Sequence, residues 1–301
     1  MRVALITPGS IADAAWNSEA YRGLLQIRDS LQVATSHIEA RTPAEQEEAL
    51  RTYAARGYDL VFGHGFEFQA PAERVSAEYP RTAFVITSGE RAAGNVSAIV
   101  FRLEDPTYLA GMIAGGLTRS NVIGYVGGIE LPPIKAAYEG WVRGAQAVNP
   151  EVDSRQIYLN SFDDAAAGRE AALALIRVGA DMLTHNADAA GLGLFQAARE
   201  TPGVYLFGAN ADQASLAPER VIGSAVIDIP RALLLTAREV RAGTFRPRVR
   251  AFGLASGVLR YAPNPALDSL VPEGLKARLR AAADSIAAGT LQAAPPSVAL
   301  R

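Results

Sequence analysis

Cysteine is absent from this sequence of 301 residues, and histidine occurs only three times. Without cysteine the chain has no disulfide, no thiolate metal site and no cysteine nucleophile. It also lacks a G-x-S-x-G elbow, an H-E-x-x-H motif and a Walker loop, so no complete nucleophilic, zinc-binding or phosphate-binding set of residues is present. We therefore expect a protein that is not an enzyme and that holds no metal and no cofactor.

The sequence also lacks an excess of one charge and any long apolar run. Its 29 basic and 31 acidic residues are interspersed and give a formal net charge of −2, which argues against a nucleic-acid or anionic-membrane surface. No apolar run approaches the length of a membrane-spanning helix, and no signal peptide precedes the first strand-like residues. With 49% hydrophobic residues, the composition is that of a soluble globular protein large enough for two α/β lobes.

Residues 121–150 combine a strand, a loop and a helix in one stretch. The apolar, β-branched residues 122–126 precede a Gly-Gly pair, and a helical spacing of apolar residues follows. Residues 2–31 repeat this plan, and both helices carry a Tyr-x-Gly motif, at residues 21–23 and 138–140. The repeat predicts two Rossmann-like lobes. Because ligands bind beyond the carboxyl ends of strands in open α/β sheets, we expect a ligand site where two such starts face each other.

Strand and helix patterns alternate along the chain. Short apolar runs predict strands at residues 3–6, 36–40, 59–62, 82–86, 96–100, 122–126, 155–159, 181–184, 204–207 and 221–225. Segments with helical spacing separate most of them, which indicates βαβ units and parallel sheets. The strand at 96–100 is expected at an edge or in a connection. The segment 272–291 predicts an amphipathic helix, and residues 293–301 are expected to fray.

Motifs in the loops resemble a known family over nearly the whole chain. They are Ala15-Trp16-Asn17, Gly63-His64-Gly65-Phe66-Glu67-Phe68, Glu104-Asp105 before YLAG, GYVGGIELPPI with YEGWVRGAQAVNP, Asn160-Ser161-Phe162-Asp163-Asp164, Gly179-Ala180-Asp181 and Phe207-Gly208-Ala209-Asn210-Ala211-Asp212-Gln213. In their order and spacing the sequence resembles the basic-membrane-protein family, which comprises PnrA-like substrate-binding proteins of ABC transporters. Characterised members bind purine nucleosides.

The resemblance implies a two-lobed clamp of the type I periplasmic-binding-protein architecture, with three hinge crossovers. The first lobe would comprise residues 1–118 and about 226–256, and the second residues 119–225 and about 257–301. It further implies a monomer that works with an ABC permease and an ATPase. The protein would act in the periplasm or in association with the extracytoplasmic side of the membrane if an export segment has been removed, and in the cytoplasm if Met1 is the native start.

A purine calls for aromatic stacking and a few aimed polar groups, and stacking on an aromatic side chain contributes roughly 1–3 kcal/mol. The resemblance and the residue types predict stacking on Trp16 and Phe162. The complete set of expected ligand-binding residues is Trp16, Asn17, Phe66, Ser88, Phe162, Asn186, Asp188 and Asn210. The amide, hydroxyl and carboxylate groups of this set would bind the polar edges of the ligand.

Three positions depart from the family pattern. Asn210 stands where nucleoside-binding members tend to carry an aspartate, and residues 224–227 read Ser-Ala-Val-Ile where members carry Ser-x-Val-Lys. Residues 87–90 read Thr-Ser-Gly-Glu in place of the usual aspartate. The first two changes remove charge that would hold ribose hydroxyls. We therefore expect either a purine nucleoside or a free nucleobase as the ligand.

Other interpretations of these residues remain open. A Trp beside an Asn at a helix start is also typical of a packed helix cap, and Phe162 would serve equally as a staple for the next helix. His64 and His185 are more typical of satisfied structural histidines than of ligand contacts. Asp163 and Asp164 are interpreted as an N-cap pair, and Asp105 is likewise interpreted primarily as a helix cap.

Two other functions compete with transport. A cytosolic ligand-sensing regulator would use the same clamp without a permease. A nucleoside hydrolase is the sharpest chemical rival, but its expected acidic cluster at the first strand is absent, because only Asp13 stands there.

Overall fold

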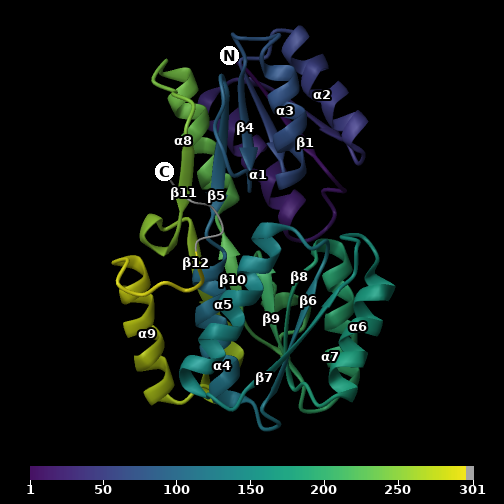
Figure 1. Ribbon diagram of the computed structural model, residues 1–301, viewed down its shortest axis with the longest axis vertical. Coiled ribbons are helices and arrows are strands. Elements are labelled where there is room, and N and C mark those ends of the chain that lie inside the picture. Colours follow the sequence, from purple (N-terminus) through teal and green to yellow (C-terminus); the bar gives the residue numbers. More distant parts are fainter. Residues whose placement is uncertain (296–301) are drawn as a thin grey trace. The chain divides into compact units, whose positions relative to one another are not determined.

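A computed structural model describes residues 1–295 as two compact units, each a six-stranded sheet with helices on its faces (Figure 1). Unit 1 comprises Met1–Phe101 and Asp228–Phe252. Among the described residues, unit 2 comprises Arg102–Ile227 and 253–295. The predicted α/β class with two Rossmann-like lobes is confirmed.

The strands of unit 1 lie in the order β11-β5-β4-β3-β1-β2, and all neighbours are parallel. Its elements are β1 (Arg2–Thr7), α1 (Trp16–Leu31), β2 (Ala34–Glu39), α2 (Pro43–Ala55), β3 (Leu60–His64), η1 (Phe66–Phe68), α3 (Gln69–Ser76), β4 (Ala83–Thr87), β5 (Val96–Phe101), α8 (Ile229–Arg241) and β11 (Val249–Phe252).

Both faces of the unit 1 sheet are covered, which explains why its central strands are continuous apolar runs. Helices α2 and α3 cover one face, where Leu50 and Val75 pack against Val61 and Phe84. Helices α1 and α8 pack on each other on the other face (Figure 1). Gly23 permits this close approach, because a Cβ there would lie 3.0 Å from the Cα of Pro230.

Unit 2 repeats this strand order as β12-β10-β9-β8-β6-β7. Its elements are α4 (Glu104–Leu117), β6 (Val122–Gly127), α5 (Pro132–Val148), β7 (Asp153–Tyr158), α6 (Ala165–Arg177), β8 (Met182–Asn186), η2 (Asp188–Gly191), α7 (Leu192–Glu200), β9 (Tyr205–Asn210), η3 (Ala214–Leu216), β10 (Val221–Ile227), η4 (Leu254–Ser256), β12 (Leu259–Pro263), η5 (Pro265–Leu270) and α9 (Glu273–Ala287). Its edge strand β12 runs antiparallel to β10, whereas β11 of unit 1 is parallel to β5.

The unit 2 sheet is likewise covered on both faces. Trp141 of α5 and Ile113 of α4 pack against Tyr125 and Phe207 on one face. Helices α6 and α7 cover the other face, where Leu183 is buried among their apolar side chains. Adjacent β6 residues therefore serve opposite layers, as the period of a strand requires.

The first crossing between the units lies at Phe101/Arg102, whereas the sequence predicted it at 118/119. Helix α4 therefore belongs to unit 2. The reason is its glycines: a Cβ on Gly111 would lie 2.1 Å from the carbonyl oxygen of Trp141, so α4 packs backbone to backbone on α5. The later crossings, at 227/228 and 252/253, lie near their predicted positions.

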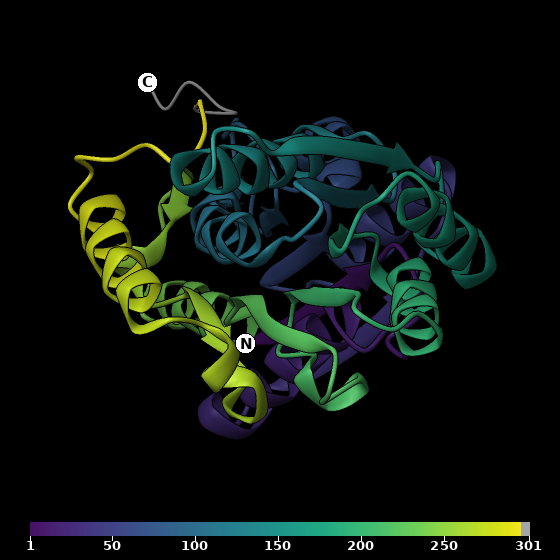
Figure 2. The same ribbon diagram turned by 90° about the horizontal axis from the view of Figure 1, so that it is seen from below.

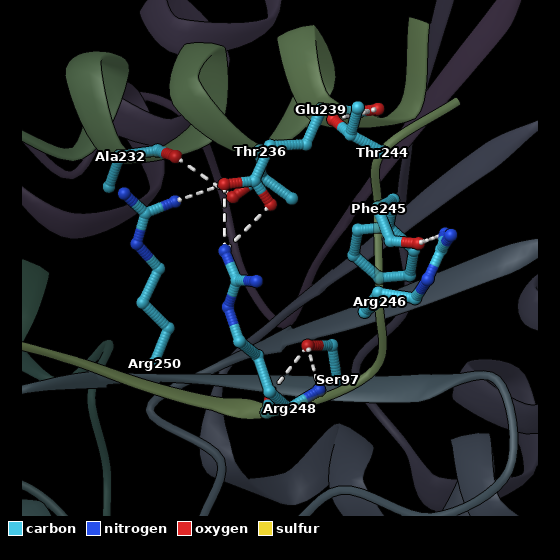
Figure 3. A network of polar contacts seen from close by, with 9 residues as sticks. All are labelled: Ser97, Ala232, Thr236, Glu239, Thr244, Phe245, Arg246, Arg248 and Arg250. Atoms are coloured by element: carbon cyan, nitrogen blue, oxygen red, sulfur yellow. Dashed lines mark hydrogen bonds and ion pairs between the residues drawn. The ribbon is translucent and has the colours of Figure 1, made fainter. Parts of the chain in front are cut away.

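Strand β11 was not predicted, and it makes β5 an interior strand. Its attachment is shown in Figure 3. The hydroxyl of Ser97 donates to the carbonyl of Arg248 at 2.5 Å and accepts from its backbone N–H at 3.1 Å. Arg248 and Arg250 both bind the carboxylate of Glu239 on α8. The Ser97–Arg248 contacts join segments that lie 151 residues apart in the chain.

Two expectations about the chain ends and membranes can be compared with the structure. Within residues 1–295 no helix is long and apolar enough to cross a bilayer. The predicted C-terminal helix is present as α9. Ala293 and Ala294 are buried, so the expected fraying does not begin there, and the rest of the predicted frayed end, residues 296–301, lies outside the described residues.

Candidate functional site

Trp16 is the first residue of α1, at the carboxyl edge of the unit 1 sheet. The loop before it is fixed by Asp13, whose buried carboxylate accepts from the backbone N–H groups of Ala15, Asn17 and Ser18 at 3.2, 2.6 and 3.0 Å. A carboxylate at a helix N-terminus also stabilises the helix dipole. Asp13 therefore holds the start of α1 in place.

His64 contacts both the ring and the backbone of Trp16. The two rings are stacked, with centroids 4.1 Å apart and planes 22° from parallel. His64 Nε2 lies 3.1 Å from the carbonyl oxygen of Trp16, and Nδ1 lies 2.8 Å from Oγ1 of Thr87. A carbonyl only accepts, so Nε2 carries the proton and the hydroxyl of Thr87 donates to Nδ1. Burial lowers the pKa of His64 to about 3, so the ring is neutral.

The other predicted residues of unit 1 lie at the same edge. Asn17 is 4% exposed, and its Oδ1 has no hydrogen-bond partner within the described part of the chain. Phe66 opens η1 directly after β3, and Ser88 follows β4; both are partly exposed. An unpaired buried acceptor costs about 1–3 kcal/mol, so Asn17 is the polar group of this set that gains most from a bound donor.

Sequence analysis missed Glu67 as a member of this edge. Its carboxyl folds back over Gly65, and burial raises its pKa above the usual value. The only signal in the sequence was the acid between two phenylalanines.

The structure brings three predicted residues of unit 2 together. The side-chain nitrogen of Asn210 lies 3.3 Å from Oδ1 of Asn186 and 3.4 Å from Oδ1 of Asp188. All three side chains are buried. They come from the ends of β8 and β9 and the start of η2. We call Asn186, Asp188 and Asn210 the amide–carboxylate cluster.

Phe162 is placed beside this cluster by the backbone. Its carbonyl accepts from the N–H of Ala190 in η2 at 2.8 Å. Its ring covers Gly128, where a Cβ would lie 2.2 Å from the ring. Gly128 therefore serves the packing of Phe162. Asp164 is the N-cap of α6, as predicted, and accepts from the N–H of Ala167.

His185 and Gln213 fix the loop after β9 in unit 2. Oε1 of Gln213 lies 3.0 Å from His185 Nε2 and also accepts from the N–H of Ala209 at 2.9 Å. Because this oxygen accepts, the imidazole carries its proton on Nε2. Burial lowers the pKa of His185 to about 4. Each unit thus has one neutral, buried histidine at the end of its corresponding strand, which agrees with a structural function for both.

Three predicted site residues adopt left-handed backbone angles. The φ values are 55° for Ser88, 47° for Asp188 and 65° for Asn210. Such angles are uncommon outside glycine and gather at functional sites. In both units they occur where a strand ends and its side chains turn toward the carboxyl edge.

The two edges offer binding chemistry. Within residues 1–295 no group of three or more histidine, aspartate or glutamate side chains is arranged to hold a metal ion. Unit 1 presents a supported indole, an unpaired amide oxygen and the partly buried acid Glu67. Unit 2 presents the amide–carboxylate cluster and Phe162. Side chains of these types are the ones that stack on planar rings and bind polar edges in sites for small organic molecules.

This chain belongs to the Bmp family, described as PnrA-like ABC transporter substrate-binding proteins, which matches residues 1–291. The predicted family is therefore confirmed. The family is one of substrate-binding proteins and not of enzymes.

Several relatives match most of this chain. Basic membrane protein A1 of Borrelia garinii subsp. bavariensis is 30% identical over 271 residues, which are 88% of this chain and 80% of that protein. A purine-binding protein of Brucella abortus is 26% identical over 87% of this chain and 75% of its own length. A putative ABC transporter glucose-binding protein of Haloferax volcanii is 30% identical over 82% and 63%.

Solved structures agree on the fold. An ABC transporter solute-binding protein from Conexibacter woesei is 30% identical, has a TM-score of 0.78 and covers 99% of this chain and 100% of its own. A solute-binding protein from Aeropyrum pernix K1 has a TM-score of 0.90 at 21% identity, covering 97% of this chain and 92% of that one. The chain is therefore a solute-binding protein of the periplasmic-binding-protein type.

Proposed function

We propose that this solute-binding protein captures a purine nucleoside or nucleobase for an ABC importer and performs no catalytic step. The observation that carries the proposal is the amide–carboxylate cluster, because a purine presents both donors and acceptors along its edges. The amides of Asn186 and Asn210 and the carboxylate of Asp188 supply donors and acceptors that match such an edge. The relative from Brucella abortus, a purine-binding protein, supports the same ligand class.

Stacking would come from Trp16 and Phe162. The indole of Trp16 is stacked on His64, also contacts Phe101 in a T-shaped arrangement with centroids 6.0 Å apart, and is only partly buried, so part of its surface remains for a ligand ring. We propose that the residues of both units contact one ligand, with the units acting as the two lobes of a clamp. The loaded protein would then deliver its ligand to a permease and its ATPase outside the cytoplasm.

A thermal-shift screen tests this function. A ligand that binds only the folded state stabilises it by about 2.7 kcal/mol at a hundredfold excess over its dissociation constant. Adenine, guanine, hypoxanthine, xanthine and their nucleosides should include at least one strong stabiliser. Glucose, ribose, amino acids and divalent metal ions serve as controls. A rise in melting temperature with glucose alone would contradict the proposal, as would release of free base from inosine.

A further inference from the structure

Glu67 is a partly buried acid at the carboxyl edge of the unit 1 sheet. It lies in η1, which begins two residues after β3 ends at His64. The elements around it, β1, α1, β3 and η1, belong to the purple and blue part of the ribbon in Figure 2. Because β3 runs parallel to β1, the loops that follow the two strands emerge at the same edge. Glu67 therefore lies at the edge where His64 holds Trp16.

Gly65 determines where the carboxyl group of Glu67 lies. A Cβ at Gly65 would be 2.4 Å from Oε2 of Glu67 and 2.8 Å from its Cδ, so any other residue there would displace the carboxyl group. The φ of Gly65 is 144°, a value that residues with a side chain rarely adopt. The carboxyl group thus occupies a space that only glycine leaves open.

The carboxyl group of Glu67 has no cation beside it. Within residues 1–295 no other residue forms an ion pair with Glu67 or donates a hydrogen bond to its side chain. Burial raises its pKa, and no charged group acts on that pKa. The ionised form of a partly desolvated, unpaired acid is destabilised, and hydrogen-bond donors on a bound molecule would stabilise it.

The chemistry of a carboxylate decides which purine it would bind. A carboxylate offers acceptors only, and its two oxygens match two neighbouring N–H donors, as in the pairs that it forms with guanidinium groups. Guanine carries such a pair of donors on N1 and on its 2-amino group, whereas hypoxanthine has the N1–H alone. Adenine presents an acceptor at N1 beside its amino group, and this lone pair would repel one carboxylate oxygen.

We propose that Glu67 is a specificity-determining residue that binds the N1–H and 2-amino donors of a guanine base, so that guanine or its nucleoside is the preferred purine. This inference rests on the proposed purine-binding function. Each N–H would donate to one carboxylate oxygen, and both hydrogen bonds would be charge-assisted. Trp16, which His64 holds at the same edge, would stack on the ring whose donors Glu67 binds.

Calorimetry with wild type at pH 8, which favours the ionised carboxylate, tests the preference first. Guanosine and inosine differ only in the 2-amino group, so the ratio of their affinities isolates one of the two hydrogen bonds. Guanosine should bind at least about tenfold more tightly than inosine, and adenosine should bind more weakly than inosine. If no purine or nucleoside binds, the proposed function fails and this inference fails with it. Equal binding of guanosine and inosine overturns this inference alone.

Glu67→Gln exchanges one acceptor for a donor at almost constant size. An amide of this kind pairs with an adjacent acceptor and amino group of adenine. The variant should therefore bind guanosine at least about tenfold more weakly than wild type does, and it should bind adenosine more tightly. Trp16→Ala should instead weaken the binding of all three nucleosides alike, which separates stacking from recognition of the donors.

Glu90→Gln is the matched control. Glu90 follows β4 at the same edge and is partly exposed, but it is paired with Arg91 at 2.6 Å. This variant should leave the affinity ratios unchanged. Thermal unfolding without ligand checks that each variant is folded, and the wild-type ratios test the inference whatever the variants do.

Two results with the variants would overturn the inference. One is a guanosine-to-inosine affinity ratio in Glu67→Gln that equals the ratio in wild type. The other is a loss of the same size in Glu90→Gln, because the preference would then follow the total charge of this edge and not one carboxylate.

Discussion

The indole of Trp16 stacks on the imidazole of His64 with centroids 4.1 Å apart, and the same imidazole is hydrogen-bonded to the carbonyl of Trp16. His64 is itself oriented by the hydroxyl of Thr87 on the neighbouring strand. A neutral, fully buried ring therefore fixes both the backbone and the side chain of the residue proposed to stack on the ligand. His64 is a positioning residue in this account.

The first prediction concerns this pair. Trp16→Ala should weaken purine binding roughly 5- to 150-fold, the equivalent of about 1–3 kcal/mol of lost stacking. His64→Ala should weaken binding in the same direction, because Trp16 loses its support. The double variant should bind no worse than Trp16→Ala alone, since His64 acts through Trp16.

His64→Gln is the control for this cycle, because an amide can both donate to the Trp16 carbonyl and accept from Thr87. It should retain more affinity than His64→Ala. Losses that add in the double variant would show that His64 contributes to binding independently of Trp16.

The second prediction concerns acid stability. The pKa of His64 is about 3 in the folded state and near 6.5 in the unfolded chain, so the unfolded state binds the proton between these values. This contribution to stability is complete above pH 6.5 and is lost as the pH falls toward 3, by about 1.4 kcal/mol per pH unit. Urea denaturation at several pH values should show a shallower loss for His64→Gln than for wild type.

The comparison between variants matters, because other groups titrate in the same range. His185 contributes with the same sign, down to its pKa of about 4. Glu104, whose pKa burial raises to about 7, contributes with the opposite sign, since its ionisation costs stability as the pH rises. Parallel curves for wild type and His64→Gln would mean that His64 titrates alike in both states.

The third prediction concerns Asn210→Asp, which restores the family residue. The new carboxylate would lie within 3.4 Å of Oδ1 of Asp188 and would lose the donor that now binds it. One carboxyl of the pair then has a raised pKa, so the variant should be destabilised at pH 7 and should approach wild type as the pH falls toward 4. Thermal unfolding at pH 7 and pH 4 measures this.

Asn160→Asp is the matched control for this change. Asn160 is an exposed residue of the same unit with a left-handed φ of 56°. It should show no such pH-dependent deficit. An Asn210→Asp variant as stable as wild type at pH 7 would show that the cluster tolerates two carboxylates.

The fourth prediction concerns ribose. Ile227, at the end of β10, is buried and apolar, and Asn210 is neutral, so two charge-assisted hydrogen bonds of about 1.5–3 kcal/mol each are absent. The affinity for a nucleoside should therefore lie within about tenfold of that for its free base. Calorimetry with hypoxanthine and inosine decides this. A nucleoside bound a hundredfold more tightly would indicate that another group, with Asp188 the first candidate, holds the ribose.

Of the twelve strands described within residues 1–295, the sequence predicted ten and missed the edge strands β11 and β12. Apolar runs such as residues 59–62 are visible locally because both faces of the strand are buried. Strands β11 and β12 are short edge strands whose pairing partners lie far away in the chain, so no local pattern marks them. The sequence placed helix α4 in the first lobe, whereas the structure places it in unit 2. Its unit is decided by the close approach of Gly111 to α5, a tertiary contact that no local pattern shows.

The candidate site shows the same division. Polar residue type at the ends of strands predicted Asn186, Asp188 and Asn210, and the structure places the amide nitrogen of Asn210 within 3.4 Å of both other side chains. The supporting function of His64 was not predictable, because it depends on stacking across two separate elements. A lone histidine in a sequence carries no such information.

The central claim is that one purine is bound by residues of both units, and calorimetry on one residue from each unit tests it most directly. The strongest purine from the thermal screen is titrated into wild type, Trp16→Ala and Asp188→Asn, with glucose as the control solute. We predict a dissociation constant for wild type on the order of micromolar or tighter, at least tenfold weaker binding by either variant, and no binding of glucose. Binding of glucose without any purine, or a purine affinity that only one of the two substitutions changes, would contradict the account.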